Sequence, residues 1–246
     1  YYDTEFDLSG GRLVLRGTNG SGKSRALELL LPFVLDADRR KMDATGSGKV
    51  SLVELMKAGA EDRTTRAGYV WLELARAVDP ADPADAELHE SGATEQYTTV
   101  GAHIRFSRST AEAKVHYFTT DLRVGYDLEL LSPTRETLPR DKLADLIGAD
   151  RITTSPSTHR DRVRATVFTL AGDSGAERYA GLLQLLHTLR SPDVGNRIEE
   201  GRLPQILSDA LPPLDERALN AAGEQLDAFG AAGGGGTRRA APAACS

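Results

Sequence analysis

The chain has 246 residues, of which 40% are hydrophobic and 27% are charged. These fractions are typical of globular proteins and exclude wholesale disorder. The longest apolar stretch, residues 27–35, contains Glu28 and Pro32 and is far shorter than the ~20 residues that a membrane-spanning helix needs. The net charge of −6 excludes a globally basic nucleic-acid binder, although it leaves room for a local basic patch.

The cellular compartment is indicated by the cysteine content and the first residues. Cys245 is the single cysteine, so the chain has no internal disulfide. Residues 1–5 have neither the basic start nor the apolar core of a secretion signal. We therefore expect a reducing, cytoplasmic location and no contact with a membrane.

The first quarter of the chain has the pattern of a strand, a loop and a helix. Residues 12–16 alternate as a strand does, a glycine-rich turn follows, and the leucine-rich residues 26–35 favour a helix. Residues 36–50 are polar and predict a connecting loop. Ser51 is a typical N-cap for a short helix over residues 51–56.

The middle of the chain is rich in strand-forming residues. Four short segments with aromatic or β-branched side chains predict strands at residues 68–75, 98–106, 114–119 and 126–131. Between the first two of these, the polar residues 79–95 predict a surface loop.

After Pro139 the apolar residues follow a helical period. Helices are predicted at residues 140–147, 158–170, 175–189, 202–211 and 215–229. The last of these follows Pro212 and Pro213, which favour a helix start. The predicted organisation is a β-rich lobe at 1–138, a helical part at 139–213, a final helix at 214–229 and a disordered Gly/Ala-rich tail at 230–246.

The motif that indicates chemistry lies at residues 17–24, which match G-x-x-x-x-G-K-[ST] between the predicted strand and helix. The glycines let backbone N–H groups point at phosphate oxygens, and the helix N-terminus favours negative charge. Lys23 would neutralise the β- and γ-phosphates, and the Ser24 hydroxyl would bind Mg²⁺. The sequence therefore predicts ATP and magnesium as cofactors and a P-loop nucleotide site made by Asn19, Gly20, Ser21, Gly22, Lys23, Ser24 and Arg25.

Two similar fragments are interpreted as coincidences. Residues 46–49, Gly-Ser-Gly-Lys, follow no strand and precede Val50 instead of a hydroxyl residue. Residues 8–11, Leu-Ser-Gly-Gly, spell the signature of ABC-type ATPases but lie upstream of the P-loop, where that motif does not occur.

A P-loop hydrolase also needs an apolar strand that ends in Asp, often followed by Glu, to hold Mg²⁺ and polarise water. No segment fits convincingly: the strand at 69–73 ends in Glu73 without the Asp and continues apolar, and residues 214–216 follow two prolines. The five histidines have no metal-ligand spacing, so we assign them no site.

The motif and several later segments resemble the N-terminal head segment of SMC-like ATPases of the MukB type, including the SMC subunit (JetC) of the Wadjet anti-plasmid systems. The similarity includes residues 29–36 after the P-loop, 68–73, 117–120, 178–179 with 189–192, and 207–215. It extends over roughly residues 1–229. The predicted fold class is therefore α/β: the N-terminal lobe of a P-loop NTPase head of the ABC/SMC type, with a mixed β-sheet around the P-loop helix and a mainly helical part after it.

The resemblance implies a function that this segment performs only together with other parts. In the family, a long coiled coil and hinge follow this lobe, and a C-terminal lobe supplies the signature and the Asp-Glu strand. Residues 214–229 would be the root of the coiled coil, and the tail at 230–246 departs from the family pattern. ATP held between two heads of a homodimer would drive engagement, together with kleisin-type and accessory subunits and DNA. Neither Gln184 nor Gln205 is singled out to complete the Mg²⁺ shell.

Two other functions remain open from the residues alone. The chain could be a self-contained P-loop NTPase, for instance a small-molecule kinase with Glu73 near the metal, or an inactive truncated remnant. Tyr1 and Tyr2 precede a strand-like segment and either stack on the adenine of the nucleotide or pack on the lobe.

Overall fold

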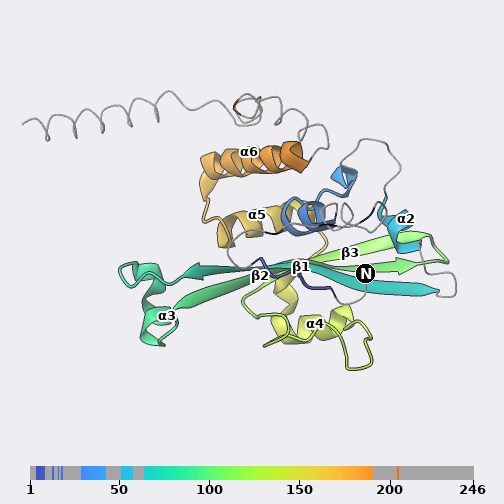
Figure 1. The fold of residues 1–246 in the computed structure, drawn as a ribbon, viewed down its shortest axis with the longest axis horizontal. Helices are drawn as coiled ribbons and strands as arrows, with labels where there is room; N and C mark the ends of the chain where they lie inside the picture. The colour runs from blue at the N-terminus through green and yellow to red at the C-terminus, as the bar shows by residue number, and fades with distance from the viewer. Residues whose placement is uncertain are drawn as a thin grey trace, which may run out of the picture.

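The computed structural model describes residues 4–8, 13, 16, 18, 29–42, 51–57, 64–190 and 204. At the centre of this part of the chain is a four-stranded sheet in the order β1-β2-β3-β4 (Figure 1). The strands are β1 (Thr65–Ala77), β2 (Glu95–Ser107), β3 (Glu112–Thr120) and β4 (Ile152–Thr153). The α/β class agrees with the prediction. The described strands pair only antiparallel, so the mixed character expected of the sheet is not seen among them.

The sheet is organised by the alternation of its side chains. β1 and β2 pair along their whole lengths, from Thr65 opposite Ser107 to Ala77 opposite Glu95. On β2, Val100, Ala102 and Ile104 are buried on one face, as a period of two requires. The strands predicted at 68–75, 98–106 and 114–119 are confirmed, and all three extend beyond the predicted ends.

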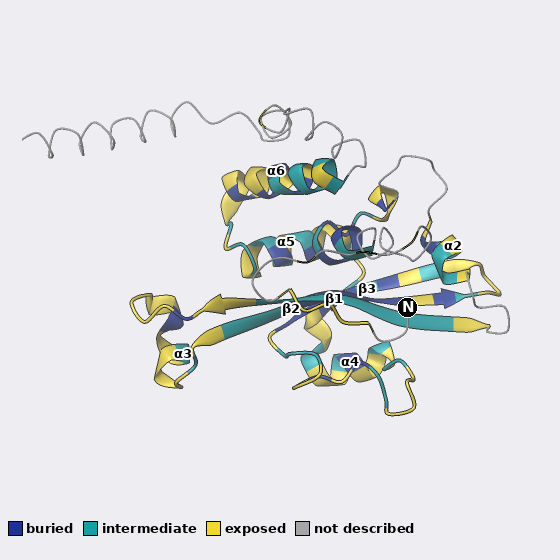
Figure 2. Ribbon diagram, viewed as in Figure 1, coloured by how far each residue is buried: buried dark blue, intermediate teal, exposed yellow. Residues whose placement is uncertain are grey.

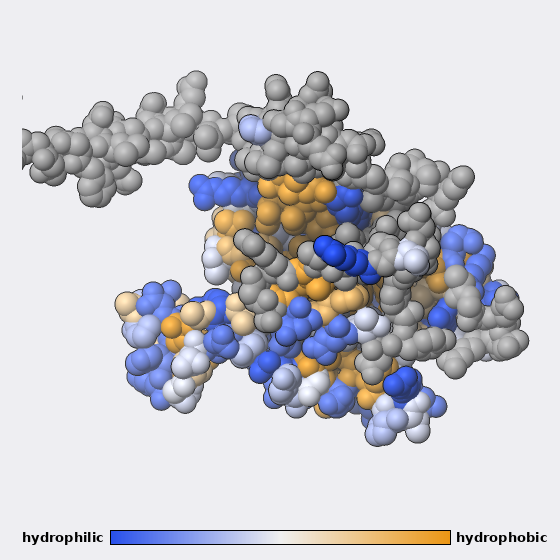
Figure 3. Space-filling model, in the orientation of Figure 1, coloured by the Kyte–Doolittle hydropathy of each residue, from blue (hydrophilic) through white to orange (hydrophobic). Residues whose placement is uncertain are grey.

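One face of the sheet is covered by two layers of helix (Figures 1 and 2). The chain segment 29–42, α2 (Leu52–Lys57) and α5 (Pro156–Thr166) lie next to the sheet, and α6 (Gly172–Arg190) lies outside α5. The inner side of α6 is buried and its outer side is exposed. Figure 3 shows apolar residues gathered on α6 and beneath it. The partly buried Leu182 and Leu186 of α6 pack against the core.

The opposite face of the sheet is covered by α4 (Arg140–Ile147). Phe118 of β3 and Leu143 of α4 are fully buried there, together with Leu128 and Leu130 of the preceding loop. α4 follows Pro139 and ends at Gly148, whose φ of 95° suits glycine. A 3₁₀ turn, η5 (Ala149–Arg151), then leads into β4, which joins the sheet although it lies in the segment predicted to be helical.

The predicted surface loop at 79–95 is wrong in part. It contains a 3₁₀ turn, η4 (Pro83–Asp85), and α3 (Ala86–Glu90), which extend beyond the sheet at the ends of β1 and β2 (Figure 1). Asp82 caps the turn by accepting from Ala84 N, and Pro83 has the φ that a helix start needs. The polar composition of this segment did not reveal the caps, because composition predicts solvent exposure and does not predict backbone geometry.

The predicted strand at 126–131 is also wrong. The backbone there turns: Arg123 O accepts from the N–H groups of Asp127 and Leu128, and Gly125 has a φ of 83°. Leu128 and Leu130 point into the core under α4, which explains their alternation without a strand. Tyr126 is 75% exposed.

The helices predicted at 51–56, 140–147, 158–170 and 175–189 are present, but the third of them ends four residues before the predicted 170. α4 has the predicted bounds, and α2 is capped by Ser51 Oγ, which accepts from Glu54 N at 3.2 Å. α5 begins two residues before the predicted 158 and ends at Thr166, and α6 starts earlier than the predicted 175. The predicted helices at 202–211 and 215–229 and the tail at 230–246 lie outside the described residues, apart from Pro204.

Candidate functional site

The residues expected to bind the nucleotide lie outside the described part of the chain. This is true of Asn19 to Arg25, including the predicted phosphate ligand Lys23 and magnesium ligand Ser24, and of Tyr1 and Tyr2. Of the P-loop itself, the structure describes Thr18, which is exposed. The nucleotide contacts therefore stay predictions. The described chain resumes at Leu29, within the helix expected at 26–35 after the P-loop.

The end of that helix is a π-helical turn, η2 (Leu31–Leu35), in which Asp36 N donates to Leu31 O at 3.0 Å. Phe33 and Val34 are completely buried against the sheet and the helices around it. Single π-turns in helices occur often at functional sites. The turn places Asp36 at the junction of the sheet-covering layer with α6.

Side chains from three other elements bind the backbone at this helix end. The last carbonyl groups of a helix have no partner within it and need one elsewhere. Four consecutive carbonyl oxygens each contact a side chain: Val34 with His159 Nε2 at 2.8 Å, Leu35 with Tyr179 Oη at 2.9 Å, Asp36 with Arg160 at 3.2 Å and Ala37 with Tyr117 Oη at 3.1 Å. The donors come from α5, α6 and β3, so the helix end is fixed to all three elements.

Asp36 forms a polar cluster at the same place. Its carboxylate is 3% exposed and lies 2.9 Å from Lys41 Nζ, 2.7 Å from His187 Nε2 and 3.8 Å from Arg160. Burial by itself raises the pKa of Asp36, but the hydrogen bonds from His187 and Lys41 outweigh it and lower the pKa below its usual value. Asp36 is therefore ionised at neutral pH and attracts cations to this point.

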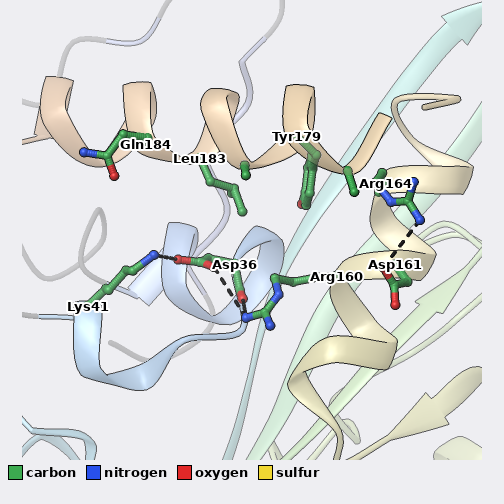
Figure 4. Close-up of a pocket in the computed structure, with 10 residues that line it drawn as sticks. Asp36, Lys41, Arg160, Asp161, Arg164, Tyr179, Leu183 and Gln184 are labelled. Atoms are coloured by element: carbon green, nitrogen blue, oxygen red, sulfur yellow. Dashed lines mark hydrogen bonds and ion pairs between the residues drawn. The ribbon is translucent and has the colours of Figure 1, made fainter. Parts of the chain in front are cut away.

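A cavity of about 390 Å³ opens beside Asp36, between the segment 36–41, α5 and α6 (Figure 4). Its polar wall is formed by Lys41, Arg160, Arg164 and Gln184, and its apolar wall by Tyr179 and Leu183. Gln184, one of the two glutamines considered for the Mg²⁺ shell, thus lines this cavity. Gln205 lies outside the described residues.

His159 and His187 contact the helix end, although sequence spacing assigned them no role. His159 is fully buried, stacks on Tyr117 at 4.8 Å and has a pKa lowered to about 4, mainly by burial. It is neutral at pH 7 and donates one hydrogen bond to Val34 O. The sequence holds no local signal for these roles, because the partners are 125 and 151 residues away. Within the described residues, no group of three or more acidic, His or Cys side chains is arranged to hold a metal.

Glu73 is held in an ion pair on the opposite side of the sheet from α5. Its carboxylate lies 3.1 Å from Arg123 Nε, and the Arg123 guanidinium lies between the rings of Tyr97 and Tyr126, at 3.9 and 4.2 Å. Glu73 lies within β1, which confirms the interpretation of residues 69–73 as a sheet strand. An acceptor already paired to an arginine is poorly placed to bind a metal as the kinase alternative requires.

Comparisons with known proteins identify no relative. No family model, curated protein sequence or solved structure matches the chain. None of the helices in the described ranges is long and apolar enough to cross a membrane.

Proposed function

We propose that this chain is the ATP-binding N-terminal half of the head of an SMC-like, DNA-handling ATPase. The observation that carries the proposal is the P-loop sequence at residues 17–24, between a strand pattern and a leucine-rich helix pattern. The end of that second pattern is helical and buried against a sheet, which is the environment that a P-loop helix needs.

In this proposal, the chain binds the phosphates but does not complete the reaction. Backbone N–H groups of residues 19–24 and the Lys23 ammonium surround the triphosphate, and Ser24 binds Mg²⁺. The Asp-Glu strand that positions water would come from the C-terminal lobe of the same protein, and a second head would cover the nucleotide. Kleisin-type and accessory subunits, DNA and a place in cytoplasmic anti-plasmid defence belong to the same proposal.

Nucleotide binding by the purified chain tests the first step. Lys23→Ala removes a cation from a desolvated phosphate site, and we expect it to weaken MgATP binding by about 2–4 kcal/mol, measured by calorimetry. Lys49→Ala is the matched control, because Lys49 ends the look-alike fragment at 46–49 and carries the same charge. Equal affinity in the wild type and Lys23→Ala would refute the P-loop assignment.

A further inference from the structure

The cavity beside Asp36 has an excess of positive charge. Its wall contains three cations, Lys41, Arg160 and Arg164, and two carboxylates, Asp36 and Asp161. Asp161 pairs with Arg164 at 3.5 Å, and of the cations in the wall Lys41 lies closest to Asp36, at 2.9 Å. The wall therefore carries one more positive than negative charge, and Lys41 and Arg160 share the carboxylate of Asp36.

Toward the described residues, Lys41 and Arg160 use only part of their hydrogen-bond donors. An ammonium has three N–H donors and a guanidinium has five. Within the described ranges, Lys41 gives one hydrogen bond, to the Asp36 carboxylate, and Arg160 gives one, to the Asp36 carbonyl oxygen. Their side chains are 45% and 37% exposed, so the remaining donors are accessible from the cavity.

The two cations are held in place before any ligand arrives. Asp36 is buried and ionised; its Oδ2 contacts both Lys41 and His187, and its Oδ1 faces Arg160, so it restrains the two cations near one another. Preorganised cations bind an anion with less loss of side-chain entropy than free surface cations do. Across the cavity, Tyr179 and Leu183 of α6 present an apolar wall, and Ala180 also lines it.

We propose that this cavity binds a small phosphate monoester. Its phosphate contacts Lys41 and Arg160, because a guanidinium and an ammonium together match the charge and the several acceptor oxygens of that group. Its organic part lies against Tyr179 and Leu183. The cavity volume of about 390 Å³ is within the usual range for small-molecule sites. None of the residues that line the cavity belongs to the P-loop sequence at 17–24.

Phenyl phosphate is the probe, and calorimetry of the full chain is the measurement. The titration uses the Lys23→Ala background, so that P-loop binding does not add to the signal. We expect binding in this background and a loss of at least about tenfold in affinity in Arg160→Gln, which removes charged hydrogen bonds. Arg178→Gln is the control, since it makes the same charge change at an exposed position of α6 outside the cavity.

Several results would overturn the site. The first two are that phenyl phosphate does not bind, or that Arg160→Gln binds it as tightly as the Arg160 chain does. The others are that Arg178→Gln loses as much affinity as Arg160→Gln, or that neutral phenol binds as tightly as phenyl phosphate. Circular dichroism checks that Arg160→Gln is folded, and Lys41→Gln repeats the test at a more exposed residue if it is not. The proposed ATP function is judged separately, by MgATP binding with and without Lys23, so either idea can fail alone.

Discussion

At the residue scale, Gly101 shows how closely the sheet packs. A Cβ at this position on β2 would lie 2.6 Å from the Phe118 ring and 2.6 Å from Val70 O. Both distances are shorter than any van der Waals contact, and one of the two atoms belongs to the backbone and cannot rotate away. The strand therefore needs glycine for space and not for an unusual φ.

We predict that Gly101→Ala lowers the free energy of unfolding by about 1–3 kcal/mol, as overpacking of a core does. Urea denaturation measures the change. Gly68→Ala is the matched control: Gly68 also lies in the sheet, on β1, but a Cβ there meets no atom within 4 Å. Similar stability of the two variants would contradict the packing argument.

His103 is a buried histidine that folding keeps neutral. It is 3% exposed between Tyr69 and His116, and its pKa is lowered to about 4, first by burial and then by the charges of His116, Arg105 and Arg140. In the unfolded chain a histidine takes up its proton near pH 6.5. The unfolded state therefore binds more protons between these two values, and stability falls as the pH falls from about 6.5 to about 4.

His103→Phe removes this titration, and the free energy of unfolding should then vary less with pH in that window, by up to about 3 kcal/mol. Denaturation curves at pH 4.5 and pH 7 provide the measurement. Some dependence will remain, since the pKa of His159 is also lowered to about 4. His89→Gln, at an exposed site on α3, serves as the control, and an equal effect there would exclude His103 as the source.

At the element scale, the tip formed by η4 and α3 depends on one buried carboxylate. Asp85 is fully buried; it accepts from Arg76 at 2.7 Å and from Asp79 N at 2.9 Å. The Arg76 hydrogen bond is the first cause of a pKa lowered to about 2, so Asp85 stays charged above that pH. These contacts join the end of β1 to the turn, where few apolar residues are present.

Asp85→Ala removes these contacts, and we predict faster cleavage at Leu88 of α3 by thermolysin without a change in the melting temperature of the rest. Local opening, which proteolysis detects, is expected where a segment has few buried apolar contacts. Glu90→Ala makes the same charge change at an exposed position of α3 that does not flank the cleaved Glu87–Leu88 bond, and it should leave the cleavage rate as it is. Equal rates in the two variants would mean that Asp85 does not hold the tip.

Local patterns predicted elements well where local contacts determine them. The bounds of α4 follow from Pro139, the helical period and Gly148, all within ten residues. The prediction of a strand at 126–131 failed because the alternation of apolar residues there reflects two leucines packed under α4 rather than strand pairing. The two-residue β4 gave no signal, since a strand of that length is defined by its partner, β3.

At the scale of the whole molecule, the proposal predicts that the chain alone is almost inactive as an ATPase. The residues that position the attacking water and those that cover the second face of the nucleotide would both come from other parts of the assembly. We expect turnover well below ~1 per second, slower than typical enzymes. Co-expression with a C-terminal lobe should raise it. Fast turnover by the chain alone, abolished by Ser24→Ala, would instead support the self-contained enzyme.

The sequence by itself determined the P-loop motif, most strands of the sheet and the position of α4, because each depends on residues close together in the chain. Only the tertiary structure brought Asp36, Arg160 and His187 together at the end of one helix, across separations of more than 100 residues. Such contacts depend on how α5 and α6 pack over the sheet. This packing results from many weak apolar contacts. A local sequence pattern therefore does not predict which distant polar groups the packing will bring side by side.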